Sequence, residues 1–419
     1  NQDTGAGDLV CPWETPNMTA LAADGINFQQ GYSPQAVCAP SRVSLMNGWH
    51  PARNVKTHVE GGTPPAPGAA STKLVQPYYK GRMEYSDYTI AEALRDAGYF
   101  TGHVAKWHCA ITHSASPLAN EQGFEFSNTG RGVTSKMNNR YTYISPGVVT
   151  GDFATADPTD GYKVGNPGAV GDRGERPRDA VTENAIAFIA ESVNPADPDG
   201  NGRPFFLYLA HWLVHTPIHQ RDEELLKYYC AKLGYDYDGT DTPGNDADDF
   251  NQFIDGNGNW TVQGQKNPFY GAMVDTLDWS LGKIVAYLKA TDDPRNPGYK
   301  LYDTTYIFFT SDNGGIELTA GEQITDNAPL KFGKAHIDEG GVRVPFVVAG
   351  PGISPGGVSQ QIVSALDFYP TILALTGAPG RASQNAHLDG VNLDPYLKGA
   401  ETRVNDPNGN LRDALYFHF

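Results

Sequence analysis

The chain has 419 residues, of which 39% are hydrophobic and 19% are charged, an ordinary balance for a folded protein with one large α/β domain or two smaller ones. A formal net charge of −17 argues against nucleic acid or an anionic membrane surface as a partner. No apolar run reaches the length of a membrane span. Any anionic substrate must therefore be held by a local cluster of cations.

The cysteine content excludes two classes of small scaffold. Four cysteines are too few for a disulfide framework, and their spacing matches no zinc site. One disulfide is possible, but the sequence does not choose its partners. The chain starts at Asn1 without a methionine, so we expect a processed or truncated N-terminus, and the lack of a signal peptide says little about location.

The first elements that the sequence predicts are a helix and a strand. Thr15 can cap a helix that has proline in its first turn and runs to Asp24, where Gly25 ends it. The strand Ile26–Tyr32 follows. A glycine-rich loop, Gly5–Leu9, precedes both.

The most informative stretch is Val37–Gly48. Pro40 fits the first turn of a helix, because its missing N–H costs nothing there, so Cys38 lies at the helix N-terminus. Exposed amides at that end favour negative charge, and a thiol placed there near the Arg42 guanidinium would have a lowered pKa. The alternative is an ordinary buried cysteine in front of a helix.

A second group of polar residues follows a helix and a short strand. Tyr88–Ala97 has helical periodicity and is stopped by Gly98. The next strand leads to Lys106 and His108, which point to one face if the backbone stays extended. Open α/β sheets bind ligands at the carboxyl ends of their strands. Taken alone, these two residues could equally be a surface lysine and a hydrogen-bonded structural histidine.

Another strand delivers histidines in the same way. After a helix over Asp179–Ser192, the apolar run Pro204–Ala210 predicts a strand buried on both faces. It leads to His211 and then to His215, of which we expect His211 to be structural or peripheral. The segments 49–81, 109–180 and 234–264 are predicted to be loops or loop-rich, and we expect them to shape the pocket.

The last polar pair follows a long helix, Asn267–Ala290, and a buried strand, Thr304–Thr310. Asp312 and Asn313 place a carboxylate beside an amide oxygen, which suits a hard cation such as calcium. The alternative is an Asx turn, because Asp-Asn-Gly is common turn chemistry.

Several of these segments together resemble the type I sulfatases. Cys38, Pro40, Ser41, Arg42, Leu45 and Gly48 have the spacing of the family signature, whose cysteine is oxidised to formylglycine after synthesis. The other similar segments are a Gly-x-Gly-Asp-Leu loop at 5–9, a Gly-Lys-Trp-His motif at 105–108 with alanine in place of glycine, a His-x-Pro at 215–217, and a Gly-Lys at 333–334 ahead of the Glu-Gly-Gly-x-Arg-Val-Pro of 339–345.

The resemblance implies a divalent metal. Counting back from the Gly5–Leu9 loop puts Asp3 on the second of two aspartate positions and Gln2 on the first, whereas one inserted residue would put Asn1 on the second position. Cys38, Asp312 and Asn313 complete the implied set. In the family the ion is Ca²⁺, and the residues themselves are also compatible with Mg²⁺.

The resemblance also implies a mechanism. Lys106 and Lys334 neutralise the sulfate oxygens, and Arg42 lies beside the nucleophile. One hydroxyl of the hydrated aldehyde derived from residue 38, held on the metal, attacks sulfur. His215 then protonates the departing alcohol, and His108 takes the proton of the second hydroxyl so that sulfate leaves.

The implied fold is α/β, with a large central mixed β-sheet sandwiched by helices as in alkaline phosphatase. Residues 1–395 would form the catalytic domain, and 396–419 would begin a smaller C-terminal subdomain that is cut short. The implied partners are a sulfated small molecule or glycan and the machinery that makes formylglycine, with a secreted or periplasmic location. The sequence leaves open which ester is cleaved and the oligomeric state.

Two other functions compete with a sulfatase acting on a sulfated carbohydrate or an aryl sulfate. A phosphonate or phosphodiester hydrolase of the same superfamily shares the cysteine motif, although the Lys106–His108 segment favours sulfate. A non-catalytic protein that binds sulfated glycans is supported only by the uncertain ligand at position 2 or 3, and the intact Cys38 motif opposes it.

Overall fold

The structure is a computed structural model of the chain. It describes residues 11–59, 78–110, 116–130, 180–197, 199–215, 218, 223–236, 253, 261–262, 264–319 and 322–418. The predicted ligand Asp3 and the Gly5–Leu9 loop lie outside these residues, as do most of the segments 109–180 and 234–264. None of the helices in the described ranges is long and apolar enough to cross a bilayer.

The strands form two principal sheets, which gives the mixed α/β architecture that the sequence predicts. The first has the order β5-β8-β1-β9, in which β8 is antiparallel to both neighbours and β1 is parallel to β9. The second has the order β3-β2-β4 and is parallel throughout. The strands are β1 (Gly25–Tyr32), β2 (Phe100–Lys106), β3 (Phe126–Gly130), β4 (Phe205–Ala210), β5 (Ile307–Thr310), the separate pair β6 (Glu317–Thr319) and β7 (Glu322–Gln323), β8 (Phe346–Ala349) and β9 (Gly357–Ser364).

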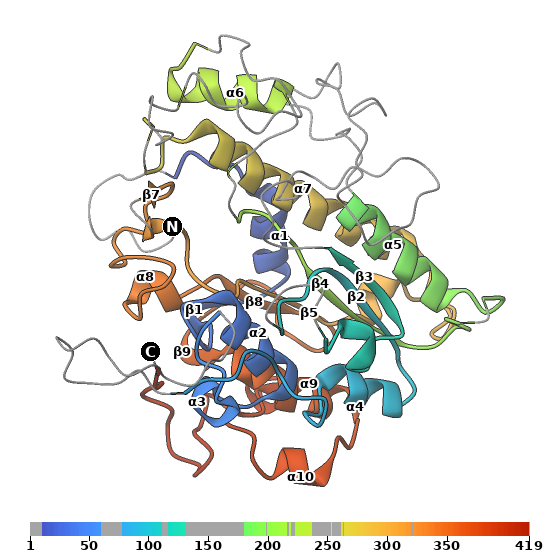
Figure 1. Cartoon of the computed structure of the whole chain (residues 1–419). Helices are drawn as coiled ribbons and strands as arrows, with labels where there is room; N and C mark the ends of the chain where they lie inside the picture. The colour runs from blue at the N-terminus through green and yellow to red at the C-terminus, as the bar shows by residue number, and fades with distance from the viewer. Residues whose placement is uncertain are drawn as a thin grey trace.

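Helices cover both faces of these sheets (Figure 1). On one face α1, α5 and α7 pack together, with α6 against α7, and on the other face α2, α4 and α9 pack together. The α-helices are α1 (Pro16–Asp24), α2 (Cys38–Asn47), α3 (Pro51–Asn54), α4 (Ile90–Asp96), α5 (Ala180–Val193), α6 (Glu223–Leu233), α7 (Pro268–Ala290), α8 (Glu339–Val342), α9 (Phe368–Thr376), α10 (Ala382–Asn385) and α11 (Asp394–Leu397). The 3-10 turns are η1 (Ala119–Glu121), η3 (Leu301–Thr304) and η4 (Ala365–Asp367).

The predicted helix boundaries are close to the observed ones for identifiable local reasons. Helix α2 begins at Cys38 and ends before Gly48, which has a left-handed φ of +71°. At the start of α4, Thr89 and Glu92 form a reciprocal capping box. The expected cap of α1 is wrong in detail, since Thr15 precedes the helix but its side chain makes no capping hydrogen bond.

Other structural expectations can also be checked. Cys11, Cys38 and Cys109 carry free thiols, so they form no disulfide with one another. Glu339 and Arg343 form an ion pair of 3.6 Å. Arg412 pairs at 2.6 Å with the fully buried Asp367 of η4, so residues beyond 395 pack into the same core. The division into two domains at 395 stays a prediction.

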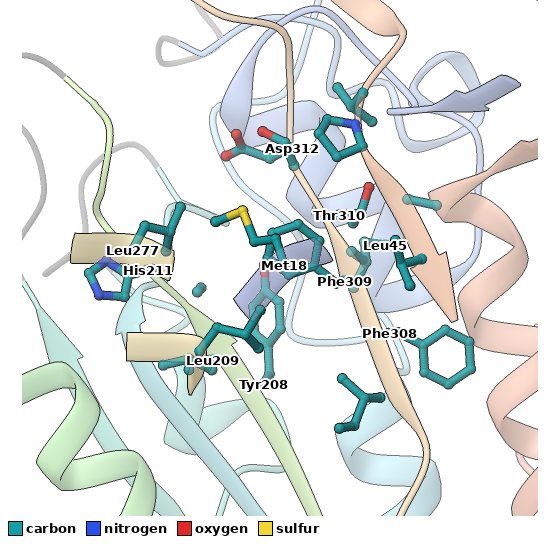
Figure 2. A pocket seen from close by; sticks show the side chains of 18 of the residues that line it. Met18, Leu45, Tyr208, Leu209, His211, Leu277, Phe308, Phe309, Thr310 and Asp312 are labelled. Atoms are coloured by element: carbon teal, nitrogen blue, oxygen red, sulfur yellow. The ribbon is translucent and has the colours of Figure 1, made fainter. Parts of the chain in front are cut away.

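The burial of β4 and β5 differs from the prediction. Every residue of β5, and all of β4 except Ala210, is only half-buried, whereas β2 and β8 are buried throughout. The reason is a cavity of about 1180 Å³ that runs between the two strands. Figure 2 shows Tyr208 and Leu209 on one side of it and Phe308, Phe309 and Thr310 on the other.

We call the part of this cavity between β4 and β5 the slot. It separates the two sheets, and for this reason the expected central sheet consists of two hydrogen-bonded halves. Leaving even a third of the cavity empty and dry would cost on the order of 9 kcal/mol at about 24 cal/mol per Å³, which is comparable with the whole net stability of a domain, about 5–15 kcal/mol. The whole cavity is therefore too large to be an ordinary packing defect.

Candidate functional site

The predicted site residues, apart from Asp3, meet at the carboxyl ends of the strands. Lys106 is the last residue of β2, and Asp312 and Asn313 directly follow β5. Cys38 opens α2 after β1. His108, His215 and Lys334 lie on loops that return to the same place, as their contacts with this group show.

Cys38 is at the centre of the group. Its side chain is only 2% exposed, and its Sγ lies 3.1 Å from the Lys106 Nζ and 3.2 Å from the Asn313 Oδ1. Burial raises the pKa of the thiol. The charges of Lys106 and Lys334, together with hydrogen bonds from His108 and His215, lower it by more than burial raises it. The pKa of Cys38 is therefore well below its ordinary value. This pocket stabilises negative charge at the position of the Cys38 sulfur.

The lowered pKa of Cys38 agrees with the sequence-based prediction, but its leading causes differ from the expected one. Lys106 at the end of β2 and Lys334 on a distant loop lower it most, while Arg42 also interacts with the Cys38 charge, which raises the pKa of the arginine. Arg42 points its Nε at the Asp312 Oδ2, 2.7 Å away, and its Nη1 at the Lys106 carbonyl, also 2.7 Å away. Burial lowers the pKa of Arg42, but Asp312, Tyr208 and Cys38 together raise it by more, so the guanidinium stays charged.

The backbone around Lys106 also differs from the extended strand that we predicted. Ala105 has φ +78° and His108 has φ +53°, both in the left-handed region. Lys106 and His108 nevertheless both reach the Cys38 thiol. The left-handed φ explains why the similar family motif has glycine at position 105, since glycine adopts this conformation without strain.

Lys334 and His215 form the other wall of the site. The Lys334 Nζ lies 2.8 Å from the His215 Nε2. The Lys334 amide donates to the Gly315 carbonyl, and the next amide, of Ala335, donates to the Ala36 carbonyl just ahead of Cys38. Burial, and then the charge of Lys106, lowers the pKa of His215, so this imidazole is neutral in the absence of an anion.

Asp312 and Asn313 have the donor chemistry of a hard-cation site. The Asn313 Nδ2 donates to the Gly314 carbonyl at 2.8 Å, which turns its Oδ1 toward residue 38. Carboxylate and amide oxygens fit Ca²⁺ or Mg²⁺, although calcium takes about six to eight oxygens, more than these two residues supply. The predicted ligand Asp3 lies outside the described residues. The donors present therefore fit part of a metal site.

Comparison with known proteins identifies the family. A model of the sulfatase family matches residues 10–378, which is most of the chain. The chain belongs to the sulfatase family. It is 28% identical to the N-acetylgalactosamine-6-sulfatase of Homo sapiens over the whole of this chain and 66% of that protein. It is 29% identical to an arylsulfatase of Hemicentrotus pulcherrimus over 89% of this chain and 56% of that protein. The chain thus spans just under two thirds of the length of the curated relatives that it matches most strongly.

Solved sulfatase structures have the same fold. The structure of Ps i-CgsB has a TM-score of 0.62 and 28% identity over 95% of this chain and 73% of the other. A putative sulfatase from Bacteroides fragilis has a TM-score of 0.55 and 19% identity over 93% of this chain and 74% of the other. These similarities confirm the predicted alkaline phosphatase-like α/β fold. A phosphonate monoester hydrolase from Silicibacter pomeroyi, with a TM-score of 0.51 and 18% identity over 95% of this chain and 74% of the other, shares the fold alone.

Two residues of this sulfatase site were missed by the sequence analysis. The Tyr208 hydroxyl accepts a hydrogen bond of 3.3 Å from the Arg42 Nη1. The Trp212 ring lies under the Lys106 ammonium, 5.1 Å from the nitrogen to the ring centroid. A tyrosine in an otherwise apolar strand was the available signal for Tyr208, because a buried phenol needs a polar partner. The Nδ1 of His211 accepts a hydrogen bond from the Leu213 amide, and its role as a structural or peripheral residue stays a prediction.

Proposed function

We propose that the protein hydrolyses sulfate esters of carbohydrates with a nucleophile formed from Cys38. The observation that carries this proposal is the convergence of two lysines and two histidines on the buried Cys38 thiol. A tetrahedral anion needs several cations and donors around one point, and an ordinary buried cysteine needs none. The −17 net charge makes this local positive pocket the feature that attracts an anion.

Each residue has a role that follows from its position. Lys106 and Lys334 bind the sulfate oxygens and stabilise the charge that grows on them in the transition state. Burial lowers the pKa of both His108 and His215, and a bound anion raises it again. His215, in contact with Lys334, then donates a proton to the departing alcohol. His108, in contact with residue 38, accepts the proton from that residue when sulfate is released.

Membership of the family implies two further groups in the site, formylglycine and a divalent cation. Formylglycine at position 38 supplies a hydroxyl nucleophile and an exit for sulfate that a thiolate lacks, and a divalent cation on Asp312, Asn313 and Asp3 supplies positive charge at the ester oxygens. We propose Ca²⁺ as that cation, with Mg²⁺ as the alternative. Arg42 is a positioning residue, because it orients Asp312 and the end of β2.

The carbohydrate class of substrate rests on the relatives. The human relative is named for a sulfated N-acetylgalactosamine, and Ps i-CgsB has been solved in complex with k-i-k-neocarrahexaose. We propose a sulfated glycan as the substrate on this basis, and a secreted or periplasmic location.

The proposal is tested on protein purified from its natural source. We expect the peptide that carries residue 38 to have lost its sulfur and gained an aldehyde, as read by mass spectrometry. The same protein should release sulfate from a panel of sulfated oligosaccharides and an aryl sulfate, and should act poorly on a phosphonate monoester. Unmodified Cys38 in folded, natural protein would overturn the nucleophile. Preference for the phosphonate would reassign the reaction, and binding of sulfated glycan without turnover would make the protein a lectin.

A further inference from the structure

Asn327 connects two loops that carry residues of the site. Its side-chain Nδ2 donates to the Gly315 carbonyl at 3.4 Å and to the Phe332 carbonyl at 3.1 Å. Gly315 comes two residues after Asn313, on the loop that follows β5, and Phe332 comes two residues before Lys334. One carboxamide therefore ties the segment with the hard-cation donors to the segment with the lysine.

The backbone from which this side chain extends is itself held in place. The Asn327 amide donates to the Glu317 carboxylate at 2.8 Å, and the Asn327 carbonyl accepts from the Leu330 amide at 2.9 Å. An asparagine that only turns the chain directs its side chain to an amide about two residues further on. The Asn327 carboxamide instead reaches carbonyls that lie 12 residues before it and 5 residues after it. Its nitrogen must face them, because a carbonyl accepts only from a donor.

Two glycines leave the space that this carboxamide occupies. A Cβ on Gly333 would lie 2.3 Å from the Gly315 carbonyl oxygen and 2.7 Å from the Asn327 Nδ2. A Cβ on Gly315 would lie 2.9 Å from the Asn327 Oδ1. The two loops and the carboxamide between them are thus packed without room for a further atom, which fixes how far apart the loops lie.

The backbone around Lys334 needs such a support. Phe332 has φ +58° and Ala335 has φ +70°, so a residue other than glycine adopts the left-handed conformation on either side of Lys334. Residues in this conformation persist where the surrounding structure holds them. The Lys334 amide donates at 2.8 Å to the Gly315 carbonyl, which is the same oxygen that the Asn327 Nδ2 contacts. The carboxamide therefore acts on the backbone of Lys334 through a shared acceptor and through the Phe332 carbonyl.

We propose that Asn327 is a positioning residue, whose carboxamide fixes the Lys334 ammonium at the place that the sulfate group occupies. The Lys334 Nζ lies 2.8 Å from the His215 Nε2, so a shift of this loop would displace the charge from the anion and from the proton donor together. A displacement of about 1 Å in a positioned group can cost on the order of 10²-fold in rate. This inference rests on the proposed function, because the anion-binding role of Lys334 comes from there.

The experiment is a double-mutant cycle between Asn327→Ala and Lys334→Met, on protein matured in its natural source. Sulfate release from 4-nitrophenyl sulfate gives kcat and KM for each form. We expect Asn327→Ala alone to lower kcat/KM by about 10–100-fold, divided between kcat and KM in the same proportion as the loss in Lys334→Met. In the protein that already carries Lys334→Met, the same substitution should lower kcat/KM by less than about twofold, because the group that Asn327 positions is gone.

Asn385→Ala is the matched control. The Asn385 Nδ2 also donates to a backbone carbonyl, that of Pro379 at 2.9 Å, but Asn385 belongs to α10, which lies far from β7 and the loop that follows it (Figure 1). This substitution should change kcat/KM by less than about twofold.

Asn327→Leu separates hydrogen bonding from space filling, because leucine has a similar size and no donor. It should behave like Asn327→Ala, and full activity in this variant would overturn the proposal. Equal fold-losses from Asn327→Ala with and without Lys334→Met would also overturn it, since they would show an effect that does not act through Lys334. If one of the two Asn327 variants does not fold, the other completes the cycle. Failure of both to fold would show a purely structural role and would overturn the proposal as well.

The failure of the proposed function would look different. Lys334→Met with unchanged kcat/KM would refute the anion-binding role of Lys334, and no sulfate release by the unsubstituted protein would refute the sulfate-ester chemistry. Either result would overturn this inference together with the proposed function. A large loss in Lys334→Met with none in Asn327→Ala would overturn this inference alone.

Discussion

The carboxyl end of the slot and the body of the slot are built in opposite ways. At the carboxyl end, charged and polar side chains join the two sheets: Arg42 donates to Asp312 on one side and to Lys106 and Tyr208 on the other, while Lys334 contacts His215. In the body, the apolar walls of β4 and β5 face each other across the cavity. The difference shows that the geometry of the site is held by its own cross-links, largely independently of whether the strands beneath it are paired.

The nucleophile position gives the largest expected effect at the polar end. Cys38→Ala should lower kcat/KM on a sulfated substrate by at least about 10⁴-fold, because it removes the group on which the lysines and histidines converge. The control is Cys230→Ala, another buried cysteine, which lies in α6. Sulfate release by the Cys38 variant at more than a hundredth of the control's rate would refute the assignment.

Replacing Arg42, which joins the two sheets at the carboxyl end of the slot, should lower the stability of the protein. Arg42→Leu leaves Asp312 and the Lys106 carbonyl without their buried donor, and we expect a loss of about 3–5 kcal/mol in the free energy of unfolding in urea. Arg53→Leu is the matched control. Its pair with Asp389 has the same 2.7 Å distance but a half-exposed arginine, so it should cost less than about 1 kcal/mol. Equal losses would mean that Arg42 does not tie the sheets together.

Replacing Lys334, which forms one wall of the site with His215, should affect catalysis more than stability. Lys334→Met should lower kcat/KM by about 10²–10³-fold, since it removes the charge beside His215 that we propose binds the anion. Lys331→Met, three residues away and 69% exposed, should leave kcat/KM within about twofold. Similar thermal unfolding temperatures for the two variants would show that the lower kcat/KM of Lys334→Met does not come from a loss of stability. A shared loss of stability would instead indicate a structural role for Lys334.

The smallest expected effect concerns the packed core beside the slot. His103 of β2 is fully buried against Trp107 and Tyr208, and burial lowers its pKa to about 3. The unfolded chain, with a pKa near 6.5, binds more protons between pH 6.5 and 3, so stability falls as pH falls through that window. At pH 5 the loss relative to pH 8 from this residue is about 2 kcal/mol. His103→Phe should remove that part of the acid sensitivity in urea titrations. An unchanged difference between the two pH values would show that His103 is not the cause.

The parts of the fold and site that the sequence predicts are those encoded locally. The helix that starts at Cys38, the strand that ends at Lys106 and the Asp312–Asn313 pair each follow from a few adjacent residues. The partners of Arg42 and the lysines that lower the Cys38 pKa come from segments far apart in the chain, so no local pattern reveals them. The slot is the clearest example of a feature that no local sequence pattern reveals. The run Phe205–Ala210 looks like a fully buried central strand, and only the strand pairing shows that one of its edges has no strand partner among the described residues.

The strand edges of β4 and β5 that face the slot also affect the tendency of the protein to self-associate. Within the described part of the chain, β4 and β5 each have one edge without a strand partner, and such an edge is a template for joining one molecule to another. No residue of β4 carries a charge that would block such pairing. Repulsion between molecules of net charge −17 opposes the encounter at low ionic strength. At about 0.15 M salt that repulsion is screened beyond roughly 8 Å. The protein should therefore remain dispersed in dilute buffer and self-associate as salt is added.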